Sequence, residues 1–197
     1  MINILIIYDT NSGNTRRMAQ HIARGVDSVP GCEAVIRSVA KVSENLAASE
    51  PAVPVDGAPY ADVSKLSEYD GLIIGSPTHF GNMSASLKYF FDQSTSSWIS
   101  GALAGKPAAA FTSTGSMHGG QESTLLTMMM PLLHHGMLIC GLPYSHPGLM
   151  QTVQGGTPYG ASHVSGENSK RPLDKTEAAL CQLLGKRVAS IAIKLQA

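Results

Sequence analysis

The chain has 197 residues, a length that suits one domain with a full hydrophobic core, and we expect residues 1–197 to form a single domain. Apolar residues make up 43% and charged residues 14%, which excludes a disordered chain. Fourteen basic and fourteen acidic residues give a formal net charge of zero. This balance provides no electrostatic reason to expect nucleic acid or an anionic membrane as a partner.

The sequence begins with an apolar run, Ile2–Ile7, without the basic flank and small-residue cleavage site of a signal peptide. No apolar stretch is long enough to cross a bilayer. Cys32, Cys140 and Cys181 lie far apart in apolar runs and outside any metal-ligand spacing. We therefore expect a cytoplasmic protein with small buried thiols and no metal site.

Five short runs are apolar at nearly every position, which is typical of strands covered on both faces: Ile2–Tyr8, Ala34–Val39, Gly71–Gly75, Pro107–Phe111 and Met137–Leu142. Helices are predicted between and after them, one around Met18, Ile22 and Val26, one around Leu87, Phe90 and Phe91, one over 123–133 and one from Glu177 onward. This alternation predicts an α/β fold: a doubly wound, flavodoxin-like, five-stranded parallel sheet of order 2-1-3-4-5 with helices on both faces.

Two long segments do not fit a minimal domain of this kind. Residues 41–69 are rich in proline and small side chains, and we expect a surface loop with one short helix near Ser64–Tyr69. Residues 143–172 are rich in Gly and Pro and are predicted as a second long loop. Loops of this length usually bind a ligand or a partner, so Tyr144 and Tyr159 are candidates for either a pocket or an interface.

The loop after the first strand has the composition of a phosphate site. It reads Thr10-Asn11-Ser12-Gly13-Asn14-Thr15 and leads into a helix. Hydroxyl groups, backbone N–H groups and the positive end of a helix all favour an anion. Because neither the Walker A spacing nor G-x-G-x-x-G is present, a phosphate monoester fits best, and FMN is the leading candidate. The alternative is an ordinary polar turn with a good N-cap.

Two further loops follow the third and fourth strands. The first contains Pro77, Thr78, His79, Phe80 and Gly81; the second contains Ser113, Thr114, Gly115, Ser116, Met117, His118 and Gly119. Glycines let backbone N–H groups approach a flat ligand closely, and such donors could stabilise the negative charge of a reduced flavin. Each loop alone is also compatible with simple turn chemistry.

Several segments together resemble the WrbA family of flavodoxin-like, FMN-binding NAD(P)H:quinone oxidoreductases. They are Gly75–Met83, Asp92–Trp98, Ser113–Gly115, Gly119–Glu122, His134–Met137 and Gly155–Ala161, and the similarity covers essentially the whole chain in one register. The resemblance implies that Thr10–Thr15 hold the FMN phosphate and that Thr78–Phe80 and Ser113–Gly119 surround the isoalloxazine. It also implies catalytic residues His134 and Trp98 near the flavin, with His134 also contacting FMN and Trp98 supplied across a homotetramer (dimer of dimers) interface.

Two positions depart from the family pattern. The family usually has Arg at His79, so a fixed cation beside the flavin is replaced by a titratable group. It often has a bulky aromatic residue at Ser12. Both differences bear on nicotinamide docking and on the choice between NADH and NADPH.

The function that the resemblance implies is a two-electron, ping-pong transfer of hydride from NADH or NADPH, through FMN, to a quinone. The alternatives are a one-electron carrier of the flavodoxin type, which is usually strongly acidic, and an FMN-binding regulatory adaptor, for which the sequence shows no DNA-reading motif. Three assignments have ordinary alternatives: Trp98 as a plain interface anchor, His134 and His135 as cations at a helix C-terminus, and His118 as a polar contact.

Overall fold

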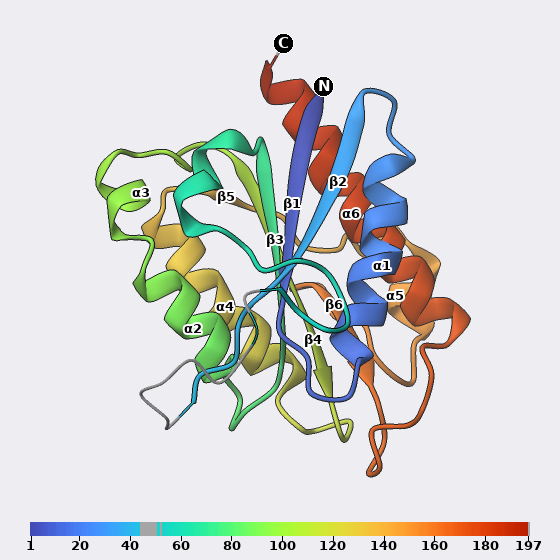
Figure 1. Ribbon diagram of the computed structural model, residues 1–197. Helices are drawn as coiled ribbons and strands as arrows, with labels where there is room; N and C mark the ends of the chain where they lie inside the picture. Colours follow the sequence, from blue (N-terminus) through green and yellow to red (C-terminus); the bar gives the residue numbers. More distant parts are fainter. Residues whose placement is uncertain (44–50, 52, 197) are drawn as a thin grey trace.

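The computed structural model describes residues 1–43, 51 and 53–196 and is built around a parallel sheet (Figure 1). The strands are β1 (Ile2–Tyr8), β2 (Cys32–Ser38), β3 (Gly71–Pro77), β4 (Pro107–Thr114), β5 (Leu138–Ile139) and β6 (Ala161–Val164). Their order is β2-β1-β3-β4-β5, and β6 also pairs with β4. The predicted order 2-1-3-4-5 is therefore confirmed.

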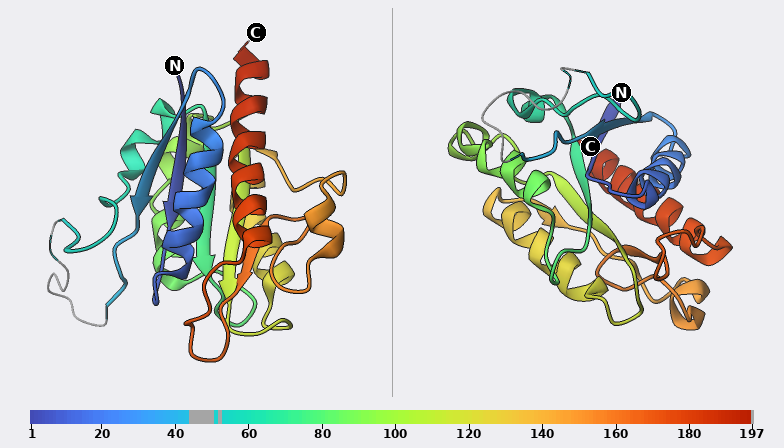
Figure 2. Two further views of the ribbon diagram at one scale, coloured as in Figure 1. Left: turned by 90° about the vertical axis from the view of Figure 1, so that its right-hand side faces the viewer. Right: turned by 60° about the horizontal axis from the view of Figure 1, so that its bottom comes forward.

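Helices cover both faces of the sheet (Figure 2). On one face lie α1 (Asn14–Asp27) and α6 (Lys175–Gln196); on the other lie α2 (Ala85–Asp92), α4 (Gln121–His134) and the 3₁₀ helix η1 (Val63–Glu68). In β1, Ile4 and Ile6 pack with α1 and α6, whereas Leu5 and Ile7 pack with α2 and α4. Successive side chains of a strand point to opposite faces, which explains why this run is apolar throughout.

The fifth position of the sheet differs from the prediction. Only Leu138 and Ile139 of the predicted strand Met137–Leu142 form β5, which pairs with the beginning of β4. The backbone N–H of Leu142 instead donates to the carbonyl of Pro158, so the chain leaves β4 at this point. β6 then pairs with the end of β4, from Phe111 to Thr114. Two short strands, β5 and β6, thus share the position beside β4 that one strand was predicted to fill.

The prediction of residues 143–172 as a plain loop was wrong, because they contain the short helix α5 (Pro147–Gln151) and β6. The chain re-enters the sheet at Gly160, where a Cβ atom would lie 2.1 Å from the carbonyl oxygen of Ala110, so only glycine allows this approach. The short helix α3 (Thr95–Ile99) was also not predicted. The predicted helix near Ser64–Tyr69 is η1, and residues 44–50 and 52 of the loop predicted over 41–69 lie outside the described residues.

Candidate cofactor site

The carboxyl ends of β1, β3 and β4 meet at one edge of the sheet, at the bottom of Figure 1. A cavity of about 160 Å³ lies there, which we call the strand-end pocket. Its lining residues come from all three predicted loops and from a fourth segment: Thr10, Asn11, Ser12, Asn14, Thr15, Pro77, Thr78, Ser113, Thr114, Gly115, Ser165 and Ser169. Ligands of open α/β sheets bind at this edge.

The first loop of the pocket ends at Gly13, the N-cap of α1. Gly13 has a φ of 82°, in the left-handed region that favours glycine, and its N–H donates to Thr10 Oγ1 at 3.0 Å. α1 has no side-chain cap at this end and no acidic residue in its first turn. The positive end of a helix of 14 residues is therefore available to an anion.

A buried carboxylate, Asp9, lies directly before this loop with 3% of its surface exposed. It accepts hydrogen bonds from the backbone N–H of Thr10 and from Lys41 Nζ. Lys41 also donates to the carbonyl of Thr10 at 3.0 Å and to Asn11 Oδ1 at 2.9 Å. Lys41 thus neutralises Asp9 and orders the loop. The sequence did not predict this cation, because Lys41 lies 30 residues away from Asn11 in the chain.

The second loop forms a tight turn at the mouth of the pocket. His79 and Asn82 exchange backbone hydrogen bonds of 2.8 and 3.0 Å. The two residues between them, Phe80 and Gly81, both have positive φ, 53° and 75°. A bulky residue rarely adopts this conformation, and here it projects the Phe80 ring fully into solvent. His79 is also exposed.

The third loop is divided between two cavities. Ser113, Thr114 and Gly115 line the strand-end pocket. Thr114 Oγ1 donates to the carbonyl of Ser116 at 2.8 Å, and the N–H of Gly119 donates to the same carbonyl at 3.1 Å, which turns the chain. Beyond the turn, Met117 and His118 line a separate groove of about 510 Å³ beside the beginning of α4.

The fourth wall comes from the segment after β6. Ser165 donates to the carbonyl of Thr114 through both its N–H and its Oγ, at 2.8 and 2.9 Å. Asn14 Nδ2 donates to the carbonyl of Ser169 at 3.0 Å. The sequence did not predict Ser165 and Ser169 as site residues, because no local pattern places residues 165–169 beside α1.

Comparison with known proteins gives the family. The model of the family described as NADPH-dependent FMN reductase matches residues 2–145. A Geobacter sulfurreducens protein described as NAD(P)H dehydrogenase (quinone) is 42% identical over 201 residues, covering 98% of this chain and 99% of that protein. The chain therefore belongs to the family described as NADPH-dependent FMN reductase. A Geotalea daltonii member of the same description is 41% identical, covering 98% of both chains.

Solved structures of flavodoxin-like proteins have the same fold as this chain. A WrbA-like flavodoxin from Agrobacterium tumefaciens matches with a TM-score of 0.68 at 22% identity, covering 98% of this chain and 99% of that one. Flavodoxin 1 from Bacillus cereus matches with a TM-score of 0.62 at 19% identity, covering 95% and 97%. These structures confirm the flavodoxin-like fold that the sequence indicated, and the two curated relatives have the description, NAD(P)H dehydrogenase (quinone), that agrees with the resemblance drawn from the sequence motifs.

The residues of the strand-end pocket fit the FMN that this family uses. An uncapped helix end and the hydroxyls of Thr10, Ser12 and Ser113 are donors suited to a phosphate monoester and a ribityl chain. Asp9, the buried carboxylate directly before the first loop, is paired with Lys41, so its charge is already neutralised. Among the described residues, no group of three His, Cys, Asp or Glu side chains could hold a metal ion.

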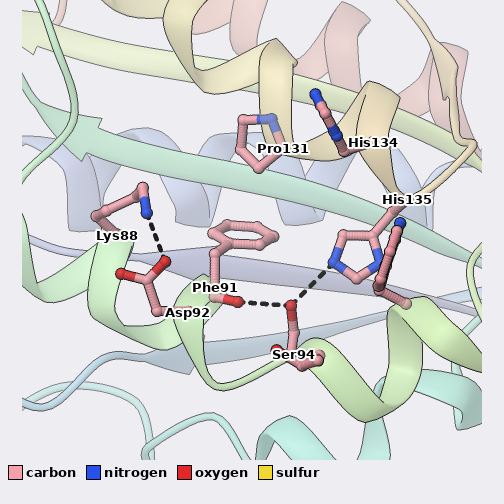
Figure 3. A pocket seen from close by; sticks show the side chains of 9 residues that line it. Lys88, Phe91, Asp92, Ser94, Pro131, His134 and His135 are labelled. Atoms are coloured by element: carbon pink, nitrogen blue, oxygen red, sulfur yellow. Dashed lines mark hydrogen bonds and ion pairs between the residues drawn. The ribbon is translucent and has the colours of Figure 1, made fainter.

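Trp98 and His134 line a different cavity of about 340 Å³, which we call the helix-face pocket. Figure 3 shows this pocket with His134 and His135 labelled. It is lined by Lys88, Phe91, Asp92, Ser94, Thr95, Trp98, Pro131, His134 and His135. α3 carries Trp98, which is 53% exposed, and α4 ends at His134. A helix that connects two parallel strands ends near the beginning of the next strand. The structure therefore does not bring Trp98 and His134 into the strand-end pocket of the same chain.

The interior of the helix-face pocket contains a hydrogen-bonded histidine. Ser94 Oγ donates to the carbonyl of Phe91 at 2.6 Å, so it accepts from His135 Nε2 at 2.9 Å (Figure 3). His135 Nδ1 is buried and has no hydrogen-bond partner among the described residues. Burial lowers the pKa of His135, and the neighbouring charge of His134 lowers it further. The bond to Ser94 therefore places a proton on Nε2 of His135.

Proposed function

We propose that this protein is an FMN-dependent NAD(P)H:quinone oxidoreductase that binds FMN in the strand-end pocket. The observation that carries the proposal is the convergence of three loops on one cavity beside the uncapped end of α1, in a chain that is 42% identical to a protein described as NAD(P)H dehydrogenase (quinone). When bound, FMN supplies the two-electron chemistry that transfers hydride from NADH or NADPH to a quinone.

In this proposal, Thr10–Thr15 bind the phosphate through hydroxyls and backbone N–H groups. Pro77–Gly81 and the start of the third loop, Ser113–Gly115, would surround the ring system, and their backbone N–H groups would stabilise negative charge there. Met117 and His118 would join the site from the adjoining groove. The exposed turn of His79 and Phe80 borders the face on which nicotinamide and quinone bind in succession. His134 holds or delivers the proton for a quinone oxygen.

We further propose that Trp98 and His134 reach the flavin from a second copy of the chain, within a homotetramer. The support is their position in the helix-face pocket together with exposed apolar side chains on α2, α3 and α4. These are Tyr89, Trp98, Ile99, Leu126, Met130 and Leu133. Large exposed apolar side chains gathered on neighbouring elements are typical of protein interfaces.

We also propose that residues 1–197 form one domain and that the protein is cytoplasmic. Cys32, Cys140 and Cys181 are all free thiols, as a reducing compartment requires. In the part of the chain that the structure describes, no helix has the length and hydrophobicity to cross a membrane.

The test is an anaerobic reaction of the FMN-loaded protein with NADH or NADPH, followed by benzoquinone, with the flavin absorbance recorded throughout. We expect the nicotinamide to bleach the flavin and benzoquinone to restore it fully, and steady-state double-reciprocal plots to give the parallel lines of a ping-pong reaction. Failure of both nicotinamides to bleach a bound flavin would refute the enzyme and favour a one-electron carrier or an adaptor.

A further inference from the structure

Glu177, near the start of α6, is fully buried and accepts hydrogen bonds from five donors. Its Oε1 accepts from the backbone N–H groups of Gly155 at 3.0 Å and Val164 at 3.1 Å, and from the Arg171 guanidinium. Its Oε2 accepts from His163 Nδ1 and from the N–H of Asp174, both at 3.0 Å. An ionised carboxylate can only accept, and here its two oxygens are surrounded by donors.

The charge state of Glu177 follows from this environment. Burial alone would raise its pKa, but the hydrogen bond from His163, the backbone N–H groups and the charge on His163 outweigh burial and lower the pKa to about 2. Glu177 is therefore ionised at every physiological pH. A buried charge with this many donors is costly to disturb, because each donor would lose its partner without gaining water.

The donors to Glu177 enclose the loop of residues 165–170 at both ends. Val164 precedes this loop and Arg171 follows it, and both donate to Glu177 Oε1. Arg171 also donates to the Val164 carbonyl through Nε and to the Ser165 carbonyl through its backbone N–H, at 2.9 Å in the latter case. The carboxylate thus closes the loop at its base.

The same loop forms the fourth wall of the strand-end pocket. Ser165 is bonded to Thr114 at the end of β4, and the Ser169 carbonyl is bonded to Asn14 in the first turn of α1. Ser169 has a φ of 54°, a conformation that a non-glycine residue keeps only where its surroundings hold it. The wall therefore runs from the end of β4, at Ser165, to the first turn of α1, at Ser169, and its Ser169 end lies beside the loop Thr10–Thr15.

We propose that the 165–170 loop binds the phosphate end of FMN and that Glu177 is a positioning residue that holds the loop there through Arg171 and β6. This inference rests on the proposed function, which places the FMN phosphate at Thr10–Thr15. It assigns Ser165 and Ser169 to the cofactor site. It also gives a role to a buried carboxylate that the reaction itself does not use.

The test compares FMN with riboflavin, which lacks the phosphate. Apoprotein is titrated into each flavin, and the quenching of flavin fluorescence gives Kd for wild type, Glu177→Gln and Arg171→Lys. A glutamine offers one acceptor oxygen where the carboxylate offers two, and a lysine has one side-chain nitrogen where Arg171 uses Nε for Val164 and Nη2 for Glu177. The control is Glu33→Gln, the same chemical change at an exposed site on β2. Circular dichroism of each apoprotein identifies the variants that fold.

We expect Glu177→Gln to raise Kd for FMN by on the order of tenfold, to change Kd for riboflavin by less than about twofold, and Arg171→Lys to act in the same direction. If Glu177→Gln does not fold, Arg171→Lys decides. Unchanged FMN affinity, or an equal loss for both flavins, would overturn the positioning role and leave FMN binding by wild type intact. If wild type binds no FMN, the pocket assignment is wrong and this inference falls with it.

Discussion

The strand-end pocket and the helix-face pocket are built in opposite ways. The first is lined mostly by hydroxyl groups and backbone from loops that follow buried strands directly. The second is lined by side chains of α2, α3 and α4 and contains the exposed Trp98 and His134. Because connecting helices run antiparallel to the strands, residues at the C-terminal ends of these helices lie at the opposite edge of the sheet from residues at the C-terminal ends of the strands. Under the proposal that Trp98 and His134 act from a second copy, cofactor binding is a property of one chain and turnover a property of an assembly.

The largest effect is expected from a substitution that disrupts the strand-end pocket alone. Ser12→Glu places a carboxylate in the phosphate loop, next to the site proposed for the FMN phosphate. Repulsion between two anions at close range in a partly buried site should weaken FMN binding by on the order of 100-fold or more. Flavin fluorescence titration measures this change. Ser67→Glu on the exposed surface of η1 is the control, and a Ser12→Glu variant with wild-type affinity would show that the phosphate binds elsewhere.

Low pH should lower the stability that Glu177 contributes to the 165–170 loop, the fourth wall of the strand-end pocket. The pKa of Glu177 falls from its ordinary value of 4.5 to about 2 in the folded protein. A depressed folded pKa contributes stability that is fully present above pH 4.5 and is lost as the pH falls toward 2. The contribution is on the order of 3 kcal/mol.

Urea unfolding at a series of pH values measures this contribution. Glu177→Gln should be less stable than wild type at neutral pH, and the difference should shrink steadily from pH 4.5 to pH 2. A difference that does not change with pH would show that Glu177 is not the group responsible.

The two pockets also differ in how much of them could be predicted. The loops at Thr10–Thr15 and Ser113–Gly115 were identified because each directly follows an apolar run, so the fold alone brings them to one edge. Lys41 beside Asp9, and Ser165 beside Thr114, depend on contacts between distant segments that no local pattern encodes. The split fifth strand has the same cause, since the apolar run continues through Leu142 while its hydrogen bonds pass to Pro158.

A smaller effect tests the helix-face pocket. Trp98→Ala should lower kcat/KM for a quinone by about tenfold, because a large aromatic surface is lost from the proposed active site, and should leave Kd for FMN unchanged. Steady-state kinetics and fluorescence titration on the same preparation measure both. Leu195→Ala, at an exposed apolar position on α6 outside the proposed interface, is the control. Equal losses of turnover and FMN affinity would mean that Trp98 has a structural role, and would remove the distinction between the two pockets.

The smallest expected effect lies in the interior of the helix-face pocket. Ser94→Ala removes the acceptor of His135 Nε2 and leaves a buried N–H without a partner, which should cost about 1 kcal/mol and lower Tm by about 2–4 °C. Kd for FMN should not change, because neither residue lines the strand-end pocket.

The double variant Ser94→Ala/His135→Phe decides whether the hydrogen bond or the packing matters there. It removes both the donor and the acceptor, and it also replaces the buried Nδ1 that has no partner among the described residues. Replacing both partners of a buried hydrogen bond with apolar groups is often nearly neutral, so the double variant should recover most of the lost Tm. A further fall in Tm would instead show that the shape of the imidazole is required, packed as it is against Phe91 at a ring-centroid distance of 6.3 Å.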